Sequence, residues 1–122
     1  MESVTWSHLP LTSAMCRMFG QLQPSDLPSF GSELAVLLEE HDCVRILNDL
    51  RDVDLRLSLM DICRIPDLVT ESGIKGNTKR AIVFSKDAGD YQFYETVSVN
   101  RGQFVRVFTD FDEAETWLTA LP

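Results

Sequence analysis

Three short apolar runs, each followed by a stretch with helical periodicity, constrain the fold of this chain more than any other feature. The runs cover residues 44–47, 81–84 and 105–108. Because they lack the polar alternation of a half-exposed strand, each is expected to be buried on both faces of a sheet. Strands that alternate with helices favour a parallel sheet covered by helices. We expect these runs to be its central strands.

The preceding residues add two strands and a helix. Residues 3–8 and 13–22 are extended runs joined by a short link with Pro10, which indicates an antiparallel hairpin ending near Gly20. Residues 24–42 predict a helix with Ser25 as its N-cap. Further helices are expected near 58–73, with a kink or break at Pro66, and over 89–102 and 110–121. The predicted fold is therefore α/β. It is a single domain, 1–122, with one mixed five-stranded sheet made of the antiparallel hairpin and a parallel βαβαβα unit.

The charge balance argues against several classes of partner. The 122 residues include 11 Lys+Arg and 19 Asp+Glu, a net charge of −8. A nucleic-acid binder usually carries a basic face, and an acidic protein is repelled by an anionic membrane. No apolar stretch approaches the roughly 20 residues of a membrane helix, and the first residues lack the pattern of a signal peptide. We expect a cytoplasmic protein with no integral membrane segment and no nucleic-acid partner.

Neither a cofactor nor a metal is expected. Cys16, Cys43 and Cys63 are widely spaced, and His8 and His41 are too few to complete a zinc site with them. We expect three buried, reduced thiols. The glycines do not form a phosphate-binding motif. The sequence therefore offers no catalytic constellation.

A cluster of acids at 110–115 has two interpretations. A calcium loop that begins at Asp110 would need glycine at position 115 and glutamate at position 121, where the chain has Glu115 and Leu121. A helix start fits better, with Asp110 as N-cap and Glu113 reaching back in a capping box. Trp117 is then expected to be a packing residue of the last helix.

Four segments, taken in order, resemble the bacterial SpoIIAA-like, or STAS/SEC14-like, group of domains. They are RILNDLRDVD, KRAIVFS, FYETVSVNRG and VRVFTDFDEAETWL. The resemblance covers about 19–121 and is most specific in the last segment. It implies a mixed sheet with helices packed on it. One branch, the anti-sigma-factor antagonists, works by protein docking under control of a phosphorylated serine at a helix start. Another branch carries lipids.

The phosphoserine motif of that first branch, Asp-Ser-Ser-Gly, is absent. The corresponding region reads DVDLRLSLMDI, in which Ser58 is the only serine. Ser58 is either a phosphorylated switch or an N-cap, with Asp61 placed three residues later to complete the cap. The N-cap is the simpler interpretation.

Candidate binding residues gather at the expected carboxyl ends of the strands, where ligands of open α/β sheets collect. They include Asp49, Arg51, Ser85 and Lys86. Arg51 and Lys86 could hold an anion. Alternatively, Asp49 and Arg51 pair with each other or cap neighbouring helices, and this interpretation is favoured.

The region 51–58 is the expected docking surface. Leu55 and Leu57 lie in it among charged residues and next to Ser58. They are either an apolar anchor with a charged rim or half-buried residues at a helix entry, and the helix entry is favoured.

Two functions remain open from the sequence. The first is a non-enzymatic regulatory or interaction domain with a protein partner. The alternative is a carrier of a small apolar ligand or lipid, for which the aromatics Tyr91, Phe93 and Tyr94 on one helix are candidate wall residues. Both a monomer and a homodimer are compatible with the sequence.

Overall fold

The computed structural model describes residues 3–9 and 13–120, with side chains from residue 13 onward. The elements follow the predicted ββαβαβαβα order. They are β1 (Ser3–Leu9), β2 (Ser13–Leu22), the 3-10 turn η1 (Pro24–Asp26), α1 (Leu27–Glu40), β3 (Arg45–Leu55), α2 (Leu59–Glu71), β4 (Lys79–Val83), α3 (Ala88–Asn100), β5 (Phe104–Phe108) and α4 (Phe111–Thr119). The predicted α/β class is confirmed.

The five strands form one sheet in the order β1-β2-β3-β4-β5. Strands β2 to β5 are mutually parallel. β1 runs antiparallel to β2 at one edge, with Leu9 opposite Ser13; the predicted link between them, at 10–12, lies outside the described residues. The expectation that 105–108 is central is wrong. Each new strand is added next to the preceding one in the same direction across the sheet. β5 therefore forms the edge opposite β1.

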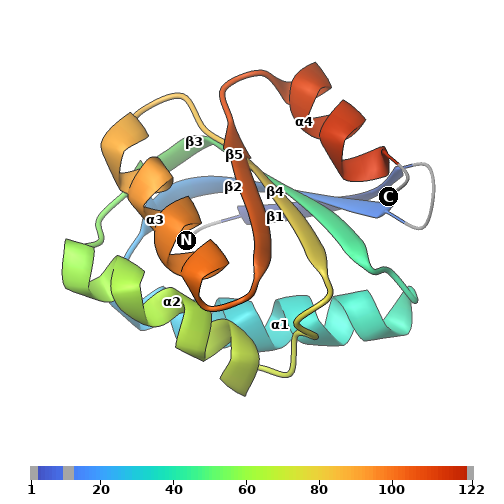
Figure 1. Ribbon diagram of the computed structural model, residues 1–122, viewed down its shortest axis with the longest axis horizontal. Helices are drawn as coiled ribbons and strands as arrows, with labels where there is room; N and C mark the ends of the chain where they lie inside the picture. Colours follow the sequence, from blue (N-terminus) through green and yellow to red (C-terminus); the bar gives the residue numbers. More distant parts are fainter. Residues whose placement is uncertain (1–2, 10–12, 121–122) are drawn as a thin grey trace.

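Helices cover both faces of this sheet (Figure 1), with α4 separated from the other three. One face carries the larger core, in which Ile46, Ile82 and Val105 pack with residues of α1, α2 and α3. The other face carries a smaller core, in which Leu47 and Val83 pack with Ala114 and Leu118 of α4. Because β3 and β4 are covered on both faces, their apolar runs show no polar alternation.

β3 extends well beyond the apolar run at 44–47 from which it was predicted. Its pairing with β2 advances from Arg17↔Asp49 to Phe19↔Asp52, two residues along β2 but three along β3. One extra residue therefore lies on β3 at a bulge, and the strand continues to Leu55. Bulges turn side chains and often lie beside functional sites. Gly20, the predicted end of β2, lies within the strand at φ +84°.

Side-chain N-caps begin α2 and α4, whereas α1 and α3 begin without a side-chain cap hydrogen bond. Gly73 and Gly102, at φ +91° and +78°, follow α2 and α3 as predicted. Pro66 lies inside α2 without ending it. The prediction of Ser25 as an N-cap is wrong, because Ser25 lies within η1. Asp26 instead accepts a hydrogen bond from the Gln23 backbone N–H, with its Oδ2 2.8 Å from that nitrogen.

Candidate functional site

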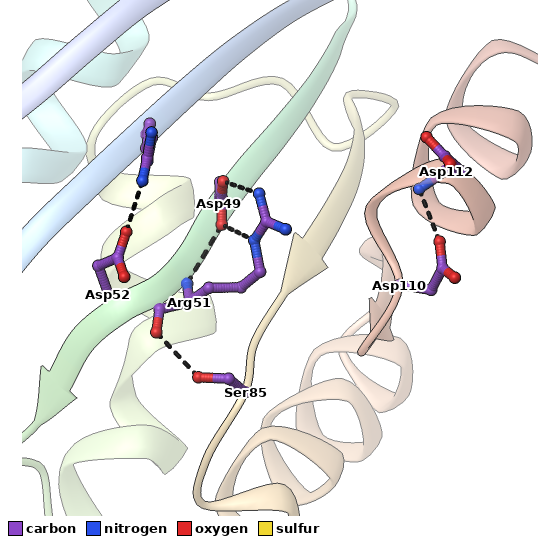
Figure 2. A network of polar contacts seen from close by, with 7 residues as sticks. Asp49, Arg51, Asp52, Ser85, Asp110 and Asp112 are labelled. Atoms are coloured by element: carbon purple, nitrogen blue, oxygen red, sulfur yellow. Dashed lines mark hydrogen bonds and ion pairs between the residues drawn. The ribbon is translucent and has the colours of Figure 1, made fainter.

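The strand-end site is built around an ion pair within β3. The Asp49 carboxylate accepts hydrogen bonds from Arg51 Nε at 2.9 Å and Arg51 Nη2 at 2.8 Å, and from the Arg51 backbone N–H at 3.2 Å. Figure 2 shows the Arg51 side chain folded back onto Asp49. The Asp49 side chain is 3% exposed and that of Arg51 is 43% exposed. The site is therefore a buried acid covered by a half-exposed base.

Electrostatics reinforce this pairing. Burial opposes ionisation of Asp49, but the hydrogen bonds and charge of Arg51 outweigh it, so the pKa of Asp49 lies below its ordinary value. The same hydrogen bonds raise the pKa of Arg51. The Arg51 guanidinium also lies 5.4 Å from the ring centroid of Phe111 in α4. Arg51 is thus already engaged, and the structure favours mutual pairing over an anion site.

Ser85 and Lys86 follow β4 at the same end of the sheet. Ser85 Oγ donates a hydrogen bond to the backbone oxygen of Arg51 at 2.8 Å, which ties the end of β4 to the bulge region of β3 (Figure 2). Lys86 is exposed. The next residue, Asp87, has φ +58° and occupies the N-cap position of α3. The structure thus brings Asp49, Arg51 and Ser85 together.

Ser58 and the two predicted anchor leucines adopt the helix-entry arrangement. Ser58 caps α2 in a reciprocal capping box: Asp61 N–H donates to Ser58 Oγ at 3.1 Å, and Ser58 N–H donates to Asp61 Oδ2 at 2.8 Å. Leu55 and Leu57 are partly buried and pack against the larger core. The exposed apolar residues are the next ones along, Leu59 at 56% and Met60 at 66%. The sequence did not single out Leu59 and Met60, because their exposure depends on where α2 begins.

An apolar cavity of about 90 Å³ lies between the sheet and the helices α1, α2 and α3. Its apolar lining includes Met18, Leu50 and Leu55 from the sheet, Leu34 from α1, Ile65 from α2, and Leu57 from the connection before α2. Gly31 also lines it, and a Cβ there would lie 2.5 Å from Ser72 Oγ. A side chain at position 31 would therefore displace the Ser72 hydroxyl, which donates a hydrogen bond to the backbone oxygen of Leu68 at the end of α2.

Polar groups enter this cavity from the sheet and from α3. Asn48, Arg80, Asp90, Tyr91 and Tyr94 all contribute to the lining. Asn48 and Arg80 are each 4% exposed. Arg80 was not predicted as a site residue. The available signal was its position two residues before Ile82, on the same face of a strand that is otherwise apolar.

The acid cluster caps a helix, and two of the three cysteines are buried. Asp110 Oδ1 accepts from the backbone N–H groups of Asp112 at 2.8 Å and Glu113 at 3.2 Å, as expected for an N-cap. No cluster of three or more potential metal ligands occurs between residues 3 and 9 or 13 and 120. Burial raises the pKa of the Cys16 thiol to about 12. Cys63 is exposed, contrary to expectation, because it lies on the outer face of α2.

None of the helices in the described part of the chain is long and apolar enough to cross a membrane.

No protein-family model matches the chain, and neither does any curated protein. Solved structures do. An anti-sigma factor antagonist from Mycobacterium paratuberculosis is 12% identical, with a TM-score of 0.65 over 97% of this chain and 94% of that one. The anti-sigma factor antagonist SpoIIAA in its unphosphorylated form is 8% identical, with a TM-score of 0.57 over 98% and 100%. A protein of the DUF3478 family from Shewanella loihica, with a SpoIIAA-like fold, is 18% identical, with a TM-score of 0.57 over 95% and 92%. This chain therefore has the fold of a SpoIIAA-like, or STAS-like, domain.

Proposed function

We propose that the protein is a non-enzymatic regulatory domain that docks on another protein through the start of α2. Its fold is similar to that of anti-sigma factor antagonists. The observation that carries the proposal is the exposure of Leu59 and Met60 in the first turn of α2. Two large apolar side chains side by side on a surface indicate an interaction site more than scattered single ones do.

The surroundings of this pair fit an interface with an apolar centre and a charged rim. Asp54 and Arg56 precede it and form an exposed ion pair, with Asp54 Oδ2 2.9 Å from Arg56 Nη2. Interfaces commonly place apolar anchors centrally and leave charged residues at the edge. The net charge of −8 favours a partner with a basic surface, because opposite charges steer association.

Capture experiments with matched variants test this proposal. The tagged wild-type protein is incubated with lysate of its source cells beside Met60→Asp and Val36→Asp. Val36 is a suitable control because it is 52% exposed on α1, away from the start of α2. A single partner should be retained by wild type and Val36→Asp and lost with Met60→Asp, while all three proteins keep the same circular dichroism spectrum. Retention of the partner by all three proteins, or by none of them, contradicts docking through the start of α2.

Binding of a small apolar ligand is a second candidate function. The cavity of about 90 Å³ supports it, because packed protein interiors rarely leave voids much larger than a water molecule. Ligand binding in this cavity does not depend on the docking surface, so an experiment can refute one proposed function without refuting the other.

A further inference from the structure

We propose that the cavity holds a short-chain aliphatic monocarboxylate, with the carboxylate at Arg80 and the chain among the leucines and isoleucines. This inference rests on the second candidate function, apolar ligand binding, and adds the chemical class of the ligand. It begins from the two buried polar residues of the cavity, Arg80 and Asn48.

Arg80 is a buried cation without an anionic partner among the described residues. Its Nη1 donates to Tyr94 Oη at 2.7 Å and its Nη2 donates to Gln103 Oε1 at 2.6 Å. Both acceptors are neutral, and the ion pairs of the described residues involve other arginines. A charged side chain taken out of water is normally paired. The fold supplies hydrogen bonds to this guanidinium, but no described carboxylate lies within ion-pairing distance of it.

The guanidinium of Arg80, a lining residue of the cavity, is held in place by Tyr94 and Gln103. Gln103 is itself fixed, because its Nε2 donates to the backbone oxygen of Pro66 at 2.7 Å. The two bonds from Arg80 use two of its five N–H donors, and Arg80 lines the cavity. A guanidinium with donors to spare matches the planar geometry of a carboxylate. Because the neighbours already orient it, little ordering is required when a ligand binds.

Asn48 places a second polar group near Arg80. Ile46 pairs with Arg80 and Asn48 pairs with Ile82, so Asn48 is the diagonal neighbour of Arg80 on the same face of the sheet. Asn48 Oδ1 is buried without a hydrogen-bond partner. Buried amides are normally satisfied. A half-turn of the amide exchanges its oxygen and nitrogen, so Asn48 is able to donate to a carboxylate that Arg80 binds.

The rest of the lining sets the size and charge of the ligand. An apolar cavity of about 150 Å³ accepts benzene, which has six carbons, so the 90 Å³ here suits an aliphatic chain of about three to four carbons. The other charged group of the lining is Asp90, one helical turn before Tyr94 on α3. A second carboxylate near Asp90 would be repelled, so the expected ligand has one acid group and an apolar tail.

Isothermal titration with butanoate and with butan-1-ol tests the inference, because the two share a chain length and differ in the head group. The wild-type protein should bind butanoate about tenfold or more tightly than butan-1-ol, the range expected for a charge-assisted hydrogen bond. Arg80→Met should abolish this preference. Arg106→Met is the matched control, since Arg106 is an exposed arginine of β5 that lies over the Phe108 ring, and it should leave the preference unchanged.

The outcomes separate this inference from the function on which it rests. Equal binding of butanoate and butan-1-ol overturns the carboxylate assignment but keeps an apolar ligand site. Binding of neither probe overturns both. If Arg80→Met does not fold, the Arg80 side-chain N–H resonance of the wild-type protein decides. Butanoate, and not butan-1-ol, should shift that resonance, and a resonance that butanoate leaves unmoved overturns the assignment.

Discussion

The carboxylate of Glu95 on α3 accepts a hydrogen bond from the backbone N–H of Val107 on β5, with Oε1 2.9 Å from the nitrogen. β5 is an edge strand, and the unpaired N–H and C=O groups of an edge can pair with another chain. Glu95 occupies one of these donors and places a negative charge beside the edge. The contact therefore protects the sheet against extension by a second copy.

Removal of this contact should increase self-association. Glu95→Ala frees the Val107 N–H and removes the charge, so the variant is expected to form concentration-dependent dimers or larger species under conditions where wild type does not. Sedimentation velocity across a concentration series measures the change. Glu33→Ala is the control, because Glu33 is an exposed acid on α1. Identical sedimentation of the two variants would show that Glu95 does not protect the edge.

The Asp49–Arg51 pair predicts a pH-dependent stability difference. Asp49→Asn keeps the shape but loses the charge-assisted bonds, and it should lower the free energy of unfolding at pH 7 by about 1–2 kcal/mol, reduced by the exposure of Arg51. The pKa of Asp49 is depressed in the folded state. The contribution of Asp49 to stability is thus fully present above the pKa of the unfolded chain, about 3.9. It is lost as the pH falls through the lower pKa of the folded protein.

Urea unfolding of wild type and Asp49→Asn at pH 7, and again at the lowest pH where both fold, measures this difference. It should shrink on acidification. Asp52→Asn is the control, because its ion pair with Arg17 is about half exposed and should be worth less than about 1 kcal/mol. A difference for Asp49→Asn that stays constant with pH would mean that packing, and not ionisation, explains its effect.

Removal of the capping box at the start of α2 should cause a modest loss in stability. Ser58→Ala removes the acceptor of the Asp61 N–H and should cost about 1 kcal/mol in urea unfolding. Ser58→Asp restores a capping acceptor, so it should recover most of the loss. Ser32→Ala, at an exposed position inside α1, should leave stability unchanged or slightly raised. If Ser58→Ala is as stable as wild type, the cap contributes nothing and Ser58 requires another explanation.

Much of the fold was predictable because the signals are local. The apolar runs of β3 and β4 are continuous since helices cover both faces, and the caps at Ser58 and Asp110 were read from spacing alone. The edge position of β5 was missed, because apolar composition reports burial but not strand order. Phe104, the first residue of β5 and the neighbour of the run 105–108, illustrates this, because it is 52% exposed although it is apolar.

The site was less predictable because it depends on where elements meet. The predicted run for β3 covered only 44–47, although the residues after Leu50 alternate, with Val53 buried between the exposed Asp52 and Asp54. The bulge obscured this pattern by shifting the alternation by one residue. Arg80 was not predicted for a related reason. Its spacing to Ile82 places both residues on one face of the strand, but its partners, Tyr94 and Gln103, lie 14 and 23 residues away, and the local pattern does not predict that this face borders a cavity.

Trp117 provides the last prediction, since it connects α4 to the β5 edge. Its ring lies 5.5 Å from Phe104 and 5.7 Å from Phe108, centroid to centroid, and Lys79 Nζ lies 4.4 Å from the ring centroid. Trp117 is only partly buried, so Trp117→Ala should cost about 2–3 kcal/mol in urea unfolding, below the 3–5 kcal/mol of a fully buried aromatic. Leu118→Ala is the matched comparison, because Leu118 is 0% exposed in the same helix. Its loss of unfolding free energy should fall within about 2–5 kcal/mol.

A loss below about 0.5 kcal/mol for Trp117→Ala, with Leu118→Ala destabilised as expected, would show that the aromatic cluster adds no stability. The exposed Phe104 and the partly buried Trp117 would then be better tested as part of an interface.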